Sequence, residues 1–285
     1  MLKTLKNPSV SAIRDTAPCS RRVLGKYAAA WMLLFVSFAQ GQAVDLIKAI
    51  DSAKKTVAPI VCLVKTVDAK EPKDVIRFQI EGTAFMVDAV GTFVTANHVI
   101  IGMLTAPLKD ICLPAITFPP HGWARTDEGV KWFAFPAGQC QSNLTFDIAI
   151  CKTQSDLSKE TGISYSVASI SGDKPPDGTA VFFTGFPLQA TDPITSIGAV
   201  AGFSAQDGYN TILIDKNAWP GASGSPIYLS DGETVIGIVL RAGGGDASGL
   251  SLGGVGQRII EILANARNNW KQAENQKQAP PSPPK

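Results

Sequence analysis

The sequence predicts an all-β fold made of short antiparallel strands, arranged as barrels or as a sandwich. Short apolar runs recur between residues 60 and 240, and Gly, Pro, Asp and Asn separate them. No long helical pattern lies between the runs, which is typical of antiparallel barrels and sandwiches. The runs are Ile60–Val64, Val75–Ile80, Thr83–Val87, Thr92–Thr95, Lys131–Phe135, Ile148–Ile150, Ala180–Thr184, Ile197–Val200, Thr211–Ile214, Pro226–Leu229 and Val235–Leu240.

A helix is predicted at each end of this β-rich region. Residues 44–59 carry apolar side chains at helical spacing as far as Ala53, and Pro59 ends the pattern, so we expect a helix and a short lead-in. A second apolar stripe predicts a helix over residues 251–271, and it consists of Ile259, Ile260, Leu263, Ala266 and Trp270. Residues 272–285 end in a proline-rich run and are predicted to be a disordered tail.

The composition is that of a globular protein. Of 285 residues, 45% are hydrophobic and 18% are charged, which excludes a wholly disordered chain. The net charge is +2, but residues 1–43 contribute +5, so the remainder carries −3 and offers no clustered basic face for nucleic acid. Two histidines and the lack of any Cys-x-x-Cys pair exclude the common zinc patterns.

Residues 1–43 are predicted to be an export signal. A basic segment precedes an uncharged window, and small residues suitable for cleavage follow at Ala39 and Ala43. The run Ser20–Lys26 resembles a bacterial twin-arginine signal, and a Sec signal is the alternative. An uncleaved membrane anchor is disfavoured because the window spans 18 residues and ends in polar side chains. Either way, we expect a periplasmic or secreted protein, with membrane contact only if the segment is not cleaved.

Export would allow the remaining four cysteines to oxidise, in any of three pairings. Cys112 and Cys140 lie near loop-like sequence, and we expect these two to form a disulfide. Cys62 and Cys151 lie inside apolar runs, where a buried free thiol fits the pattern as well as a disulfide does.

The most distinctive motif is Pro-Gly-Ala-Ser-Gly-Ser-Pro at residues 220–226, directly before a predicted strand. A serine between small residues leaves room for a substrate carbonyl, and Gly221 can adopt backbone angles that side chains disfavour. The N–H groups of Gly221 and Ser223 can then converge on one point and stabilise an oxyanion. Taken alone, the motif also fits a turn without chemistry.

Two further segments supply the partners that such a serine needs. His98 follows an apolar run, and an imidazole can take the proton of a serine hydroxyl near neutral pH. The other histidine, His121, lies in a proline-flanked loop and is expected to be exposed. Asp147 begins an apolar run. Burying a carboxylate there costs free energy unless a partner such as an imidazole N–H donates a hydrogen bond to it. Asp110 and Asp127 compete less well because neither leads directly into such a run.

Together these segments resemble the chymotrypsin-like (trypsin-fold) serine peptidases, over roughly residues 54–245. Three blocks carry the resemblance: Thr95-Ala-Asn-His98 for T-A-x-H, Asp147-Ile-Ala-Ile150 for D-[IL]-A-[LV], and Gly221-Ala-Ser-Gly-Ser-Pro226 for G-[ND]-S-G-G-P. Ala222 and Ser225 depart from the last block without removing a catalytic group. Residues 54–61 resemble the lead-in of HtrA/DegP-like peptidases, and no PDZ-like domain is expected after residue 245.

The resemblance implies two antiparallel six-stranded barrels, at about residues 60–160 and 161–250, with an active cleft between them. It implies a serine endopeptidase in which Ser223 attacks a peptide carbonyl, His98 takes its proton and Asp147 orients His98. The oxyanion would lie on the N–H groups of Gly221 and Ser223. No metal or organic cofactor is implied. The expected partner is a protein or peptide substrate, and the sequence indicates no particular oligomeric state.

The resemblance also implies a specificity pocket with Asn217 at its base and Leu240, Arg241 and Ala242 on the opposite wall. Because Asn217 is uncharged, a preference for Lys or Arg is disfavoured. Two alternative functions fit the same pattern: a non-catalytic binding or chaperone module with this fold, and a serine esterase.

Overall fold

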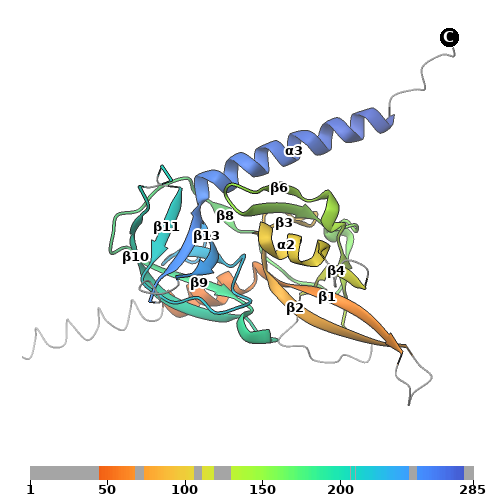
Figure 1. Ribbon diagram of the computed structural model, residues 1–285, viewed down its shortest axis with the longest axis horizontal. Coiled ribbons are helices and arrows are strands. Elements are labelled where there is room, and N and C mark those ends of the chain that lie inside the picture. Colours follow the sequence, from red (N-terminus) through yellow and green to blue (C-terminus); the bar gives the residue numbers. More distant parts are fainter. Residues whose placement is uncertain are drawn as a thin grey trace, which may run out of the picture. The chain divides into compact units, whose positions relative to one another are not determined.

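The computed structural model describes residues 45–67, 74–105, 111–118, 130–205, 207–208, 210–243 and 249–278. The predicted export signal, the last seven residues and His121 lie outside this part of the chain. Two β-sheets dominate the described residues, which confirms the all-β class (Figure 1).

The first sheet is a curled half-barrel of seven antiparallel strands, in the order β5-β4-β1-β2-β3-β7-β6. The strands are β1 (Val57–Val67), β2 (Asp74–Met86), β3 (Thr92–Ala96), β4 (Cys112–Ile116), β5 (Phe133–Ala134), β6 (Gln141–Asn143) and β7 (Ile148–Lys152). A closed six-stranded barrel was expected in this half. Within the described ranges no pairing joins β5 to β6, so the sheet stays open.

The second sheet does close. Six antiparallel strands follow the order β12-β9-β10-β11-β14-β13, and a further pairing of β12 with β13 completes the barrel. A short strand, β8, adds to β13 in parallel. The strands are β8 (Ser169–Ile170), β9 (Ala180–Gly185), β10 (Ile194–Phe203), β11 (Thr211–Ile214), β12 (Pro226–Leu229), β13 (Thr234–Ala242) and β14 (Ser251–Val255).

Strand β2 joins two runs that the sequence predicts as separate strands. Its register against β1 shifts at one point, where Ile60 pairs with Gly82 but Val61 pairs with Ile80, so Glu81 is an extra residue. Such a bulge bends a strand. Beyond it, the N–H of Thr83 donates to the carbonyl of Ser223 at 2.8 Å, which links β2 to the second barrel.

Apolar packing joins the two sheets into one body. One buried cluster lies within the first sheet, where the rings of Phe93 and Phe135 meet edge to face at 5.1 Å, and another lies inside the closed barrel. A third cluster takes residues from both sheets and includes the stacked pair Phe182 and Tyr228. Each such side chain contributes about 1.5–3 kcal/mol when fully buried, so separating the sheets would be costly.

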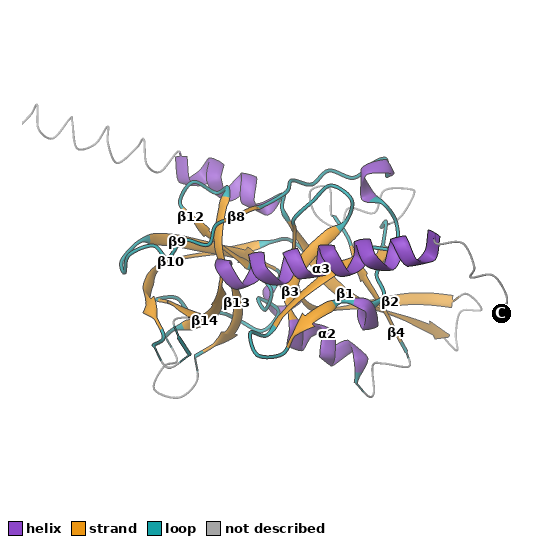
Figure 2. Ribbon diagram, turned by 90° about the horizontal axis from the view of Figure 1, so that it is seen from above, coloured by secondary structure: helices purple, strands orange, loops and turns teal. Residues whose placement is uncertain are grey.

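The C-terminal helix differs from its predicted bounds at both ends. Residues 251–255 form β14, and helix α3 runs from Gly256 to Gln278. The helix therefore includes residues 272–278, which were predicted to be disordered, because residues beyond the apolar stripe still favour a helix. Within the stripe, Ile262 is buried where Ile260 was expected. Helix α3 lies along both sheets (Figure 2).

Smaller helical elements complete the described chain. Residues 45–54 form the expected N-terminal helix. Helix α2 (Asn97–Leu104) follows β3 directly and was not predicted, and three short 3-10 helices are η2 (Ala137–Gln139), η3 (Leu157–Lys159) and η4 (Pro187–Gln189). No helix in the described ranges has the length and apolar character needed to cross a membrane.

The expected disulfide between Cys112 and Cys140 is wrong. Cys62 is bonded to Cys112, with their Cα atoms 5.1 Å apart, and Cys140 is bonded to Cys151, at 4.4 Å. Strand pairing explains this arrangement, because β1 lies beside β4 and the start of β6 lies opposite β7. Each loop-like cysteine is therefore paired with one from an apolar strand.

Candidate active site

The three predicted catalytic side chains come from separate elements and line one cleft. His98 lies in the first turn of α2, Asp147 directly precedes β7, and Ser223 lies in the turn before β12. The cleft has a volume of about 450 Å³. Its lining consists of His98, Asp147, Ala218, Trp219, Pro220, Ser223, Val239, Leu240, Arg241 and Ala242.

Asp147 holds His98 at two points. One carboxylate oxygen, Oδ2, lies 2.7 Å from the ring Nδ1 of His98, and the other, Oδ1, accepts the His98 backbone N–H at 2.8 Å. The carbonyl of Asp147 also accepts the N–H of Asn97 at 2.9 Å. With an ionised carboxylate at Nδ1, the ring proton stays on that nitrogen and leaves Nε2 as the basic atom.

The residue that makes these contacts, Asp147, has an unusual backbone conformation. Its φ is +53°, a left-handed value that is uncommon for residues other than glycine. The preceding turn is fixed by the side chain of Asn143, which accepts the N–H of Phe146 at 3.1 Å. Strain at a residue that bonds a histidine is a feature typical of functional sites.

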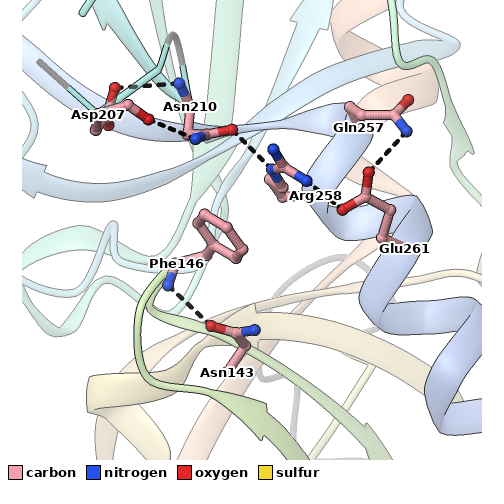
Figure 3. A network of polar contacts seen from close by, with 7 residues as sticks. All are labelled: Asn143, Phe146, Asp207, Asn210, Gln257, Arg258 and Glu261. Carbon is pink, nitrogen blue, oxygen red and sulfur yellow. Dashed lines mark hydrogen bonds and ion pairs between the residues drawn. The ribbon is translucent and has the colours of Figure 1, made fainter.

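A polar network from the second barrel and helix α3 supports this turn (Figure 3). The guanidinium of Arg258 lies 4.8 Å from the ring centre of Phe146, and its Nε donates to the side chain of Asn210 at 2.7 Å. Arg258 also pairs with Glu261 one turn further along the helix. The residue immediately before Asp147 is thus packed under a cation from α3, a contact that no local sequence pattern indicated.

Ser223 lies in a sharply turned segment. The backbone of Gly221 has a φ of +91°, and a Cβ there would come within 2.5 Å of the Phe186 carbonyl, so this position requires glycine. The Ser223 hydroxyl donates to the carbonyl of Leu240 at 3.2 Å. Within the described part of the chain it makes no hydrogen bond to His98, although both side chains line the cleft.

The predicted oxyanion donors are free. The N–H groups of Gly221 and Ser223 have no acceptor among the described residues, whereas the neighbouring N–H groups of Ala222 and Gly224 donate to Trp219 and Val239. Two unpaired N–H donors, two residues apart in the turn that carries Ser223, are the kind of groups that stabilise a developing negative charge.

Of the residues predicted to form a specificity pocket, the structure brings only some together. Leu240, Arg241 and Ala242 line the cleft as expected, but Asn217 is not part of the lining. Asn217 is half-buried, and its Oδ1 has no partner among the described residues. Ala218 and the exposed Trp219 reach the cleft instead, which the sequence motif around Ser223 did not indicate.

Residues 82–238, more than half of the chain, match the family of trypsin-like peptidase domains. The chain belongs to this family. It is therefore a serine-type endopeptidase, as the sequence predicts. The matched segment contains His98, Asp147 and Ser223.

Solved structures share the fold of this trypsin-like peptidase. The HtrA-type protease AlgW, in a structure titled "with decapeptide", has 17% sequence identity and a TM-score of 0.59, and the match covers 78% of this chain and 67% of that chain. At this identity the likeness establishes the shared fold. No curated protein sequence matches the chain.

Proposed function

We propose that this trypsin-like peptidase hydrolyses peptide bonds within proteins through Ser223, His98 and Asp147. The observation that carries the proposal is the two-point contact between Asp147 and His98 in a cleft that Ser223 also lines. This contact favours a basic Nε2 on an imidazole that lines the same cleft as Ser223, and acyl transfer to serine requires such a base.

The reaction begins when the Ser223 hydroxyl turns from the Leu240 carbonyl toward His98 Nε2. The hydroxyl proton passes to Nε2 while Oγ bonds to the substrate carbonyl carbon, and the N–H groups of Gly221 and Ser223 hold the oxyanion. The imidazolium then gives its proton to the leaving amine. Water, activated by His98, releases the acyl group and regenerates Ser223. Losing one oxyanion donor lowers the rate of such reactions about 10²–10³-fold.

A fluorophosphonate probe tests the proposal on the purified mature protein. The wild type is expected to be labelled on Ser223, and Ser223→Ala is expected to lose the label. Ser225→Ala is the matched control, because Ser225 lies two residues away but is fully buried. A folded wild type that resists the probe and cleaves no protein would overturn the proposal and favour a non-catalytic binding or chaperone module.

The same chemistry fits a serine esterase, so protein and ester substrates are compared in parallel. We expect hydrolysis of denatured protein and of internal bonds in long peptides. Activity on esters alone would contradict the peptidase proposal.

We further propose that the residue on the acyl side of the cleaved bond is uncharged. Ala218 and Val239 line the cleft, and among its lining residues the one carboxylate, Asp147, is already bonded to His98. A trypsin-like preference for Lys or Arg requires a carboxylate within the specificity pocket. Cleavage of a peptide library checks this expectation, and a dominant Lys or Arg preference would contradict it.

We also propose that the protein acts outside the cytoplasm, as a periplasmic or secreted enzyme. Its two disulfides are of the kind that persist in oxidising compartments. Alkylation of free thiols in protein taken from intact cells, read by intact mass, tests this. Four alkylated cysteines in the mature protein would contradict export.

A further inference from the structure

The direction of the Gly221 N–H is set by the peptide group to which it belongs. A trans peptide is planar, so its C=O and N–H point in opposite directions. The carbonyl in this group is that of Pro220, and it accepts the N–H of Leu188 at 2.7 Å. The Leu188 N–H therefore holds the Gly221 N–H on the side away from Leu188. Turning this peptide over would break that bond and remove an oxyanion donor.

The segment that carries Leu188 has an unusual backbone. Leu188 and Gln189 have φ values of +55° and +61°, two consecutive left-handed residues without a glycine. Such conformations persist only where the surroundings enforce them. Leu188 is 62% exposed, so packing of this residue does not enforce the backbone conformation.

The side chain of Gln189 supplies the constraint. Its Oε1 accepts the N–H of Ile80 at 2.8 Å, and its Nε2 donates to the carbonyl of Ile80 at 2.6 Å. The amide thus satisfies both backbone groups of one residue of β2, as a neighbouring strand would. These two bonds join η4, from the second barrel, to the first sheet.

The other end of the segment is tied to β2 as well. The N–H of Phe186 donates to the Thr83 hydroxyl at 3.0 Å, and that hydroxyl donates to the Gly221 carbonyl at 3.0 Å. Gly221 also packs directly on the segment, since a Cβ there would lie 3.2 Å from the Pro187 Cα. Residues 186–189 therefore form a bridge between β2 and the turn that carries the oxyanion donors.

We propose that Gln189 is a positioning residue for the oxyanion site. Its amide fixes η4 to β2, and η4 in turn keeps the Pro220–Gly221 peptide oriented with the Gly221 N–H available to the substrate. The inference rests on the proposed serine peptidase function. It assigns a catalytic consequence to a side chain that does not line the cleft.

Replacement of Gln189 should weaken transition-state binding more than substrate binding, because the oxyanion exists only after attack. For Gln189→Ala we expect kcat to fall between about 10-fold and 100-fold, less than complete loss of one donor, with KM changed less than twofold. The affinity for a peptide boronate, whose tetrahedral adduct occupies the oxyanion site, should fall by the same factor as kcat.

Two further variants make the test specific. Gln139→Ala is the matched control, because Gln139 holds the same third position in the 3-10 helix η2 and is exposed. Gln189→Gly removes the amide but favours the left-handed backbone, so it should recover part of the lost kcat. Thermal unfolding of each variant shows whether it is folded under the assay conditions.

The outcomes separate the inference from the proposed function. If the wild type hydrolyses no peptide, the proposed function fails. If the wild type is active and Gln189→Ala keeps full kcat and boronate affinity, the positioning role fails. A loss that appears in KM alone, with boronate affinity unchanged, also overturns it.

Discussion

The guanidinium of Arg258 lies over the ring of Phe146, 4.8 Å from its centre, and Phe146 is the residue immediately before Asp147. A C-terminal helix that lies outside both sheets thereby contacts the turn that presents Asp147 to His98. The contact involves three parts of the chain, because Asn210 of the second barrel accepts a hydrogen bond from the same side chain.

Loss of the Arg258 guanidinium is expected to loosen the Asp147 turn. Arg258→Gln removes a cation–π contact and the hydrogen bond to Asn210, which together contribute about 1–2 kcal/mol. We expect a lower Tm and a severalfold lower kcat/KM, measured by thermal unfolding and peptide hydrolysis. Arg267→Gln is the control on the same helix, since its ion pair with Asp88 is long, at 3.7 Å, and partly exposed. Equal effects of the two substitutions would contradict this role.

Asp147→Asn is expected to retain the fold and lose most of the activity. The Asn Oδ1 can still accept the His98 backbone N–H, but its amide N–H faces Nδ1 and forces the proton to the other ring nitrogen. A histidine in the wrong tautomer lowers kcat of serine peptidases by about 10⁴-fold. Steady-state kinetics and an unfolding curve measure the two effects. A variant with more than a tenth of wild-type kcat would show that Asp147 does not set the tautomer.

Gly221→Ala is expected to inactivate the enzyme. The added Cβ would come within 2.5 Å of the Phe186 carbonyl, at a φ of +91° that costs a side-chain-bearing residue about 1–3 kcal/mol. The turn must shift, and the oxyanion donors shift with it, so kcat should fall at least about 100-fold. Gly138→Ala, with no atom within 4 Å of the added Cβ, is the control and should leave kcat unchanged.

Much of the fold can be predicted from the local pattern of apolar residues. The predictions that fail concern segments that are distant in the sequence and meet in the fold. Short apolar runs between turn residues identify most of the strands, because strands such as β3 and β7 are buried along almost their whole length. Cysteine pairing depends instead on which strands become neighbours, so Cys62 and Cys151, inconspicuous in apolar runs, turned out to be the partners of the loop-like cysteines. The bulge at Glu81 likewise arises from pairing with β1 rather than from its own sequence.

The candidate site also contains residues that local sequence identifies and residues that it does not. His98, Asp147 and Ser223 are identifiable because each lies in a short block whose residue types its chemistry requires. The resemblance implies Asn217 at the base of the specificity pocket, but Ala218 and Trp219 line the cleft instead. Gln189 and Arg258 act across sheet boundaries through a single side chain, and a single polar residue leaves no pattern in the sequence.

The pH dependence of stability should include a contribution from Glu81. Burial raises the pKa of this carboxyl, and its Oε1 has no partner among the described residues. A raised folded-state pKa means that ionisation opposes folding, so the cost is absent below the unfolded-state pKa and grows as pH rises through the folded-state value. Glu81→Gln should therefore raise Tm at pH 8 and leave it unchanged near pH 3.5. The exposed Glu233→Gln is the control, and a pH-independent effect of Glu81→Gln would contradict this account.

The two disulfides should affect activity differently. Removing Cys140 and Cys151 together should cost roughly 2–3 kcal/mol, and removing Cys62 and Cys112 roughly 1 kcal/mol more, because the Cys62–Cys112 bond closes a longer loop. At a temperature where both double alanine variants are folded, we expect kcat to fall only when the Cys140–Cys151 bond is absent. Peptide mapping under non-reducing conditions checks the pairing, and a Cys112–Cys140 linkage would refute it.

The Cys140–Cys151 bond has a consequence for where hydrolysis begins. Asp147 lies within the small covalent ring that Cys140 and Cys151 close. In a reducing cytosol the ring is open and the acid loses a restraint, so a newly made chain would be a poor catalyst among the cell's own proteins. Under the proposed export, oxidation outside the cytoplasm would restore this restraint on Asp147.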